Sequence, residues 1–352
     1  MIQDRVAGAL IGALIGDALG LGCHWYYDLE EMRRDHGDWI STYTDPKPYR
    51  YHAGMKAGQL SQSGLITVML LRSVVENNEY REDDFTKKLD TELFPLLDGT
   101  ALQGPGGYTN QSIREAYQRR VIQKKPWNET GGNADTTEAV ERAIVLSALY
   151  AKAPGKVAGT AFSNCRLTQI DEVVVALSVA FNCSLALLIA GEKLDCALSD
   201  KLLDLIKKGD IPFQNPIVPP RPGDFLLSLY GAFSVPDPLL IPSSIARMVQ
   251  DSGIRIEPAW KASLVYGMPC SIYYQIPAAY YLAARFSDDF ESAVLHAING
   301  GGQNMSRAFL TGALVGAQVG LSNIPHRFVT GLEHADELLD LANKLGKLVA
   351  KN

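Results

Sequence analysis

The chain has no excess of positive charge, and this shortage excludes two classes of partner. Its 33 Lys and Arg residues stand against 39 Asp and Glu residues, which gives a formal net charge of −6. A protein that binds nucleic acid or an anionic membrane needs a basic surface field. We therefore expect neither nucleic acid nor a membrane as a partner.

Cysteines are also scarce, with five in 352 residues. They are odd in number and widely spaced, and none belongs to a Cys-x-x-Cys pair. The sequence therefore indicates neither a zinc site nor a disulfide framework. Reduced, buried thiols in a cytoplasmic protein are the interpretation that this pattern favours.

Strict alternation of apolar and polar residues is nearly missing, which argues against β-strands. Apolar residues instead recur at helical intervals through long segments that charged residues interrupt. We therefore predict an all-α fold class, with one compact multi-helix domain over residues 1–352. The longest predicted helices cover residues 63–77, 134–151, 169–191, 271–286 and 334–350.

A nearly uncharged apolar run over residues 6–23 resembles a signal peptide or a membrane span in its length. A signal peptide would begin with a basic cluster, whereas here Asp4 stands beside Arg5. Asp17 lies well inside the run, which argues against a membrane span. We expect a buried helix of a soluble protein.

Two segments are rich in residues that interrupt helices. Residues 97–133 contain six glycines around a short helical piece near 110–122, and residues 211–242 contain eight of the 18 prolines. Structureless stretches of this length in a compact chain are typically lids, binding loops or oligomer contacts. We interpret 211–242 as a proline-rich loop or lid, and a homo-oligomer formed through it stays open as an alternative.

Two of the expected helices carry a glycine at every fourth position. Residues four apart share one face of a helix, so each stripe exposes backbone along its length. Because glycine inside a helix costs about 1 kcal/mol relative to alanine, the stripes predict unusually close helix–helix contact. The two sets are Gly8, Gly12, Gly16 and Gly20 near the start, and Gly312, Gly316 and Gly320 near the end.

Polar and aromatic residues adjoin both stripes. His24-Trp25-Tyr26-Tyr27 follows the first, and the turn Asn299-Gly300-Gly301-Gly302-Gln303-Asn304 precedes the second. A glycine-rich turn that opens a helix exposes backbone N–H groups, which suit a phosphate or a ribose hydroxyl. The aromatic rings suit stacking on a flat ligand, although core packing explains such rings equally well.

These motifs together resemble the ADP-ribosylglycohydrolase superfamily. The resemblance rests on GALIGALIGDALG, the GQLSQSG turn and NGGGQNMSRAFLTGALVGA, in that order, and it spans about residues 5–350. HWYYD, RLTQIDEVVVALSVAF and NIPHRF are similar to the branch that contains J-type lens crystallins and selenoprotein J. The resemblance implies a compact all-α domain. For active members it implies hydrolysis of a glycosidic bond to ADP-ribose, assisted by two Mg²⁺ ions.

The chain departs from that family where the metal is bound. Active members carry Thr-Asp-Asp where this chain reads Ser61-Gln62-Ser63, and Asp-x-Asp-Thr where it reads Gln303-Asn304-Met305-Ser306. Mg²⁺ prefers anionic oxygen ligands in octahedral array, and here the four carboxylates are replaced. We therefore expect no metal ligands and no cofactor. Asn304 and Arg307 match the crystallin-like branch, in which Gly-Gly-Asp-Asn is followed by Arg.

Cleavage of a glycosidic bond still needs carboxylates or another proton-transfer group. We expect the catalytic candidates to be Asp17, His24, Asp135 and Glu138. Asp17 either caps the turn at residues 20–25 or lies at the floor of a pocket. Asp135 and Glu138 either cap a helix start or face that pocket.

A larger set of residues is expected to bind the ligand, because the motifs of the resemblance place it beside the same pocket. Arg307 is expected to pair with a phosphate or a carboxylate, or with an acid of the chain itself. The predicted ligand-binding residues are Trp25, Tyr26, Asp28, Ser61, Gln62, Ser63, Gly301, Gly302, Gln303, Asn304, Ser306 and Arg307.

Three functions remain compatible with this sequence. The first is a metal-independent enzyme that acts on a small nucleoside- or glycoside-like molecule in the ancestral cleft. The second is a catalytically inactive protein that binds ADP-ribose or a related nucleotide. The third is a structural protein of the crystallin kind. The polar residues kept around the predicted pocket favour a small-molecule ligand, because burying such groups without a role is unfavourable.

Overall fold

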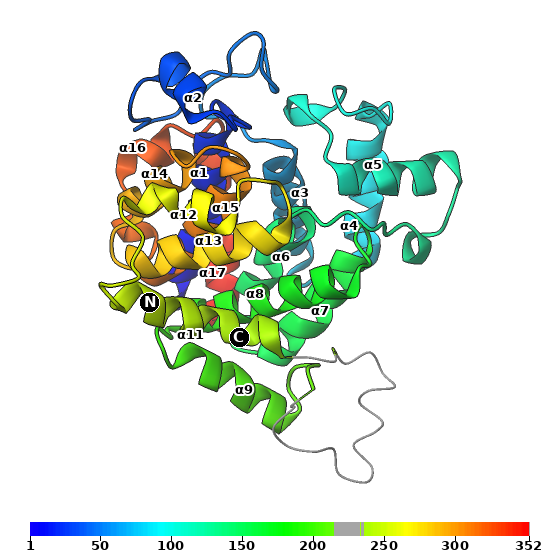
Figure 1. Cartoon of the computed structure of the whole chain (residues 1–352). Coiled ribbons are helices and arrows are strands. Elements are labelled where there is room, and N and C mark those ends of the chain that lie inside the picture. The colour runs from blue at the N-terminus through cyan, green and yellow to red at the C-terminus, as the bar shows by residue number, and fades with distance from the viewer. Residues whose placement is uncertain (215–232, 234–235, 352) are drawn as a thin grey trace.

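The protein folds into helices joined by loops, as a computed structural model shows for residues 1–214, 233 and 236–351 (Figure 1). These residues contain two isolated β-bridges and no longer strand. The predicted all-α class is confirmed. The α-helices are α1 (Ile2–Leu21), α2 (Leu29–His36), α3 (Gln62–Asn77), α4 (Glu82–Lys88), α5 (Gln111–Tyr117), α6 (Glu138–Leu149), α7 (Pro154–Arg166), α8 (Glu172–Ala190), α9 (Leu198–Lys208), α11 (Asp237–Gln250), α12 (Ala262–Tyr266), α13 (Ile272–Arg285), α14 (Phe290–Ile298), α15 (Asn304–Val319), α16 (His326–Thr330) and α17 (Ala335–Lys351).

Short helical turns connect several of these helices. They are η1 (Leu89–Leu93), η2 (Phe94–Leu96), η3 (Pro105–Gly107), η4 (Gln118–Ile122), η5 (Trp127–Glu129), η6 (Ala259–Lys261) and η7 (Leu321–Asn323). The short helical piece expected near 110–122 corresponds to α5 and η4, and the five long helices predicted from the sequence correspond to α3, α6, α8, α13 and α17.

The two glycine stripes pack against each other, so the first and last parts of the chain meet in the centre of the fold. A Cβ atom on Gly8 would lie 2.2 Å from the Gly316 carbonyl oxygen, and one on Gly12 would lie 2.3 Å from that of Gly312. Along this contact the residue numbers rise on α1 and fall on α15, so the two helices are antiparallel. Gly320 ends α15 with a positive φ of 78°, and a Cβ on it would lie 2.0 Å from a carboxyl oxygen of Asp4 in α1.

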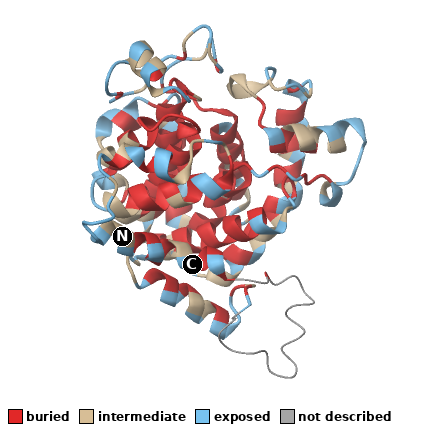
Figure 2. Cartoon of the chain, in the orientation of Figure 1, coloured by how far each residue is buried: buried red, intermediate tan, exposed pale blue. Residues whose placement is uncertain are grey.

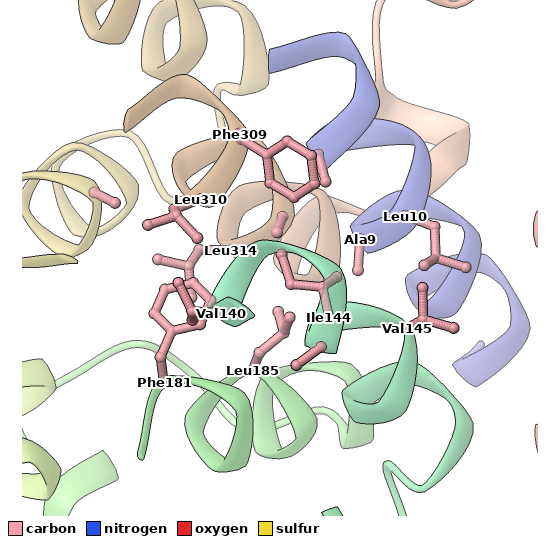
Figure 3. Close-up of a cluster of buried hydrophobic side chains, with 14 of the residues drawn as sticks. Ala9, Leu10, Val140, Ile144, Val145, Phe181, Leu185, Phe309, Leu310 and Leu314 are labelled. Carbon is pink, nitrogen blue, oxygen red and sulfur yellow. The ribbon is translucent and has the colours of Figure 1, made fainter. Parts of the chain in front are cut away.

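The α1–α15 pair forms the centre of the apolar core. Residues 6–21 of α1 are all buried, which confirms the prediction of a buried helix. Buried residues fill the middle of the molecule, and exposed ones lie at its periphery (Figure 2). Side chains of α1, α6, α8 and α15 gather in this core, among them Leu10, Ile144, Phe181 and Phe309 (Figure 3).

Among the described residues one helix, α8, is long and apolar enough to cross a membrane by length and composition, with a mean hydropathy of 2.4 over its best window. In the fold 83% of that window is buried inside the protein. Asp171 caps the helix start by accepting hydrogen bonds from Val173 N and Val174 N, both at 3.0 Å. The burial identifies α8 as a core helix packed between α6 and α7.

The proline-rich segment 211–242 ends in a helix. Residues 237–242 belong to α11, which corrects the prediction that the whole segment is not helical. Pro238 lies in the first turn of α11, where backbone N–H groups have no helical partner and proline is tolerated. Residues 215–232 and 234–235, on which most of the lid interpretation depends, lie outside the described residues.

Candidate functional site

A cleft of about 360 Å³ lies where several helices begin. The starts of α5, α6, α13 and α15 and the turn after α1 all contribute to it. The backbone N–H of Ile272 donates to the Asp135 carbonyl over 2.8 Å, which joins the start of α13 to the loop before α6. The lining residues are Trp25, Tyr108, Asn110, Gln111, Asp135, Thr136, Glu138, Pro269, Cys270, Ser271, Tyr273, Tyr274 and Gln303.

Glu138 is a buried carboxyl group on the wall of this cleft. It is the first residue of α6, and its side chain accepts hydrogen bonds from Ser112 Oγ at 2.8 Å and from Thr136 Oγ1. Its pKa is raised from 4.5 to about 7, chiefly by burial and also by the nearby Glu141, while the two hydroxyl donors oppose the rise. A group with such a pKa transfers protons near neutral pH.

Asp135 lies on the same cleft but is exposed. It does not cap α6, because Thr137 holds the N-cap position and the helix start has no side-chain cap. The cleft thus carries two carboxyl groups in different environments, one exposed to solvent and one buried. Such a pair suits glycoside hydrolysis, in which one carboxyl group donates a proton and the other acts as a base.

Trp25 and Gln303 also line the cleft, and His24 contacts both of them. Trp25 Nε1 donates to Gln303 Oε1, and His24 Nε2 lies 2.8 Å from the same oxygen. His24 stacks on Trp25 with ring centroids 4.4 Å apart. His52 Nε2 contacts His24 Nδ1 at 2.8 Å. Neither histidine lines the cleft.

Burial lowers the pKa of both histidines, to about 4 for His52 and well below its usual range for His24. Both rings are therefore neutral at pH 7. His24 was expected to transfer protons to a ligand, and the structure corrects this placement. Its position behind Trp25 and Gln303 makes it a positioning residue for the cleft wall.

The hydrogen bonds of Gln303 continue into the protein interior. Its Nε2 donates to Ser306 Oγ over 2.7 Å, and Thr137 Oγ1 lies 2.9 Å from that oxygen. Thr137 also donates to Glu141 Oε1 over 2.7 Å. Glu141 is buried, its pKa is raised by desolvation, and hydroxyl groups of Ser63, Thr137 and Ser306 stabilise its charged form.

The Ser61-Gln62-Ser63 turn lies next to this network and outside the cleft. Ser61 caps α3, with its hydroxyl accepting from Ser63 N at 3.1 Å. Gln62 Oε1 accepts from Asn110 N at 2.9 Å, and Ser63 Oγ accepts from Asn110 Nδ2 at 3.0 Å. Gln62 and Ser63 therefore fix the loop before α5, whose residues Tyr108 and Asn110 line the cleft together with Gln111 at the start of α5.

Asp17 neither caps the turn at residues 20–25 nor lies at the floor of the cleft. Its carboxyl oxygens accept hydrogen bonds from Ser61 N at 2.7 Å and Ser61 Oγ at 2.6 Å. Desolvation raises its pKa from 3.8 to about 7, with Glu141 adding to the rise. Asp17 thus ties α1 to the start of α3.

The buried acids predict how stability depends on pH. Because the pKa of Asp17 is higher in the folded chain than in the unfolded one, the folded state binds more protons between pH 4 and pH 7. The free energy of unfolding therefore falls as the pH rises through that window, by up to about 4 kcal/mol for this one group. Glu138 has the same sign, since its pKa is also raised to about 7.

The near-isosteric substitution Asp17→Asn removes the titrating group, so the fall in Tm between pH 5 and pH 8 should become shallower than in the unmodified protein. Thermal unfolding at a series of pH values measures this slope. Asp288→Asn, at an exposed position, is the control and should leave the slope unchanged. A slope that is equal in both variants would contradict the assignment of Asp17.

The glycine-rich turn contacts the protein itself. Gly301 and Gly302 have φ values of 64° and 60°, and a Cβ on them would meet the Tyr26 and Met268 carbonyls at 2.6 and 2.5 Å. Gly302 N donates to Tyr26 O over 2.7 Å. The expectation that this turn cradles a phosphate is thereby corrected.

Asn304 and Arg307 are fully buried and hold the same turn in place. Asn304 Nδ2 donates to Cys23 O over 3.0 Å. Arg307 donates to the carbonyls of Ala297 at 3.0 Å and Gly301 at 2.6 Å. Arg307 was expected to pair with an anion, but its guanidinium donates hydrogen bonds to carbonyl oxygens instead.

Tyr26 and Asp28 also lie away from the cleft. The Tyr26 hydroxyl donates to Asp35 over 2.7 Å, and the Arg50 guanidinium lies 3.7 Å from the centre of its ring. Asp28 caps α2 by accepting from Glu30 N at 2.9 Å. Of the predicted site residues, the structure brings together Trp25, Asp135, Glu138 and Gln303 at the cleft.

Sequence reasoning missed the aromatic and polar residues at the starts of α5 and α13. Tyr273 and Tyr274 open α13, and Tyr108 and Asn110 precede α5. The pair Tyr273-Tyr274, which follows Ser271, the cap of α13, after one intervening residue, was the available signal. It indicates that these rings lie in the first turn of a helix.

A family model described as ADP-ribosylglycohydrolase matches residues 1–352, so the chain belongs to the ADP-ribosylglycohydrolase family. Crystallin J1A of Tripedalia cystophora is 23% identical over 372 residues, which cover 99% of this chain and 98% of the crystallin. An uncharacterized protein of Archaeoglobus fulgidus is 23% identical over 347 residues, covering 99% of this chain and 97% of its own length.

Among solved structures, a chain titled ADP-ribosylglycohydrolase-related protein complex has the same fold. It superposes with a TM-score of 0.62 at 18% identity, and the match covers 99% of both chains. At this identity the likeness concerns the fold alone.

Proposed function

We propose that the protein is a metal-independent hydrolase that cleaves the glycosidic bond of a small nucleoside- or glycoside-like molecule in this cleft. The observation that carries the proposal is Glu138, a buried carboxyl group on the cleft wall with a pKa near 7. Glu138 donates a proton to the leaving group as the bond to the anomeric carbon breaks. Asp135 takes a proton from the water that attacks this carbon.

The side chains at the family's metal positions do not fit a pair of Mg²⁺ ions. The amide oxygens of Gln62 and Gln303 already accept hydrogen bonds from Asn110 N and Trp25 Nε1. No cluster of three or more His, Cys, Asp or Glu side chains with metal-binding geometry occurs in the described part of the chain. Mg²⁺ requires several hard oxygen ligands in near-octahedral array, so the proposed mechanism has no step through a metal.

The size and chemistry of the cleft support a nucleoside-sized ligand. Its volume of about 360 Å³ lies near the lower end for small-molecule sites. The rings of Trp25, Tyr108, Tyr273 and Tyr274 provide faces for a flat group. The five cysteines are all free thiols, which supports the reducing, cytoplasmic location that we propose.

The test is a hydrolysis assay of the purified protein with a panel of nucleosides and aryl glycosides, measuring release of reducing sugar. We expect turnover of at least one compound at the same rate in EDTA and in added Mg²⁺. Turnover that appears only with Mg²⁺ would show that the metal assignment is wrong. Binding without turnover of any compound would refute the hydrolase and favour the second candidate, a catalytically inactive protein that binds ADP-ribose or a related nucleotide.

A further inference from the structure

The cleft has an unusual charge for a family named after ADP-ribose. Its lining side chains, which all belong to the described residues, include two carboxyl groups and no Lys, Arg or His. A pyrophosphate carries two negative charges at neutral pH, and it is normally bound by arginine, lysine, a metal or free backbone N–H groups.

The arginines that touch lining residues are held by other groups. Arg114 donates to the Tyr108 hydroxyl at 3.2 Å and to the Thr109 carbonyl, with its guanidinium 5.6 Å from the centre of the Tyr108 ring. Arg50 donates to the Trp25 carbonyl at 2.5 Å and lies against the Tyr26 ring. Neither side chain is part of the cleft wall.

Backbone N–H groups at two of the helix starts are also occupied. At α6, Ala139 N donates to Gln169 Oε1 over 3.0 Å. At α13, Ile272 N donates to the Asp135 carbonyl over 2.8 Å, and Tyr273 N donates to Ser271 Oγ over 3.4 Å. These bonds occupy one N–H group at the start of α6 and two at the start of α13, which weakens both helix starts as phosphate sites.

We infer that the cleft selects unphosphorylated nucleosides and rejects nucleotides, with Asp135 as the specificity-determining residue. The inference rests on the proposed function for the site and deepens it by naming the substrate class. Asp135 is an exposed carboxylate side chain, so a phosphate on the ligand meets a like charge that no Lys, Arg or His of the cleft lining offsets. The aromatic rings of the cleft offer faces on which the base of a nucleoside can stack.

The experiment is calorimetric titration of the full chain with adenosine, adenosine monophosphate and ADP-ribose, in EDTA at low ionic strength. We expect adenosine to bind at least fivefold more tightly than the monophosphate, because a like charge about 4 Å away costs about that factor even in water. ADP-ribose should bind no more tightly than the monophosphate. Equal or tighter binding of either phosphorylated compound, or no binding of adenosine, would overturn the inference.

A substitution separates the role of Asp135 from the shape of the cleft. Asp135→Asn should narrow the ratio of adenosine affinity to monophosphate affinity at least twofold, and Asp135→Lys should reverse it. Asp288→Asn, also exposed, should leave the ratio unchanged. An unchanged ratio in Asp135→Lys would show that Asp135 does not set the specificity. Because binding is measured, adenosine bound without turnover would refute the hydrolase while this inference stands.

Discussion

Gly16→Ala is expected to lower the free energy of unfolding by about 2 kcal/mol, although alanine is the better helix former. A Cβ at this position would lie 2.1 Å from the Ala308 carbonyl oxygen, which belongs to the backbone of α15. Trimming a side chain cannot relieve such a contact. The two central helices must move apart, and the core around them loses its packing.

The matched control is Gly159→Ala. Gly159 lies inside α7, is exposed, and a Cβ there would meet nothing within 4 Å. The same substitution should therefore raise the free energy of unfolding there by up to about 1 kcal/mol. Urea unfolding of both variants gives the two values. Effects of the same sign at both positions would mean that close helix contact does not explain the stripe.

The α1–α15 contact shows what could be predicted from the sequence. Glycines at every fourth residue have no helix-forming benefit, so only close contact explains them, and the pairing of Gly8 with Gly316 and of Gly12 with Gly312 confirms it. Long apolar periodicity predicted the main helices for the same reason: a helix buries one face, and the period of its apolar residues records that face.

The site was harder to predict because it is built from helix ends far apart in the chain. Spacing along one helix could not show that Tyr108, Glu138 and Tyr273 share a cleft. Polar residues in the motifs were expected at the ligand, yet Arg307 and Asp17 bond to the protein itself. A polar residue in a motif satisfies a buried carbonyl or N–H as readily as it binds a ligand, and sequence alone does not separate the two.

The proline-rich segment was misjudged at its end for a local reason. Counting prolines treats each as an interruption, but Pro238 falls in the first turn of α11, where its missing N–H removes no hydrogen bond. The same helix also contains Pro242 in its interior, so a count of prolines does not by itself exclude a helix.

Glu138→Gln is expected to lower kcat by 10²- to 10⁴-fold on any substrate found by the hydrolysis assay, the range typical of a general acid. Glutamine has nearly the same shape and keeps an oxygen for the Ser112 and Thr136 hydroxyls, but it cannot donate a proton to a leaving group. Ligand affinity, measured by calorimetry, should change little. A variant with full activity would rule out Glu138 as the acid.

The pH profile gives an independent signature of the same group. Because the acid must be protonated, kcat should fall about tenfold per pH unit as the pH rises above about 7, the pKa of Glu138. Glu141 lies one turn further along α6, outside the cleft, and its charge is one cause of that raised pKa. Glu141→Gln should therefore keep the rate at low pH and move the alkaline fall to lower pH. If the pH above which kcat falls is the same in Glu141→Gln as in the unmodified protein, a group other than Glu138 controls that fall.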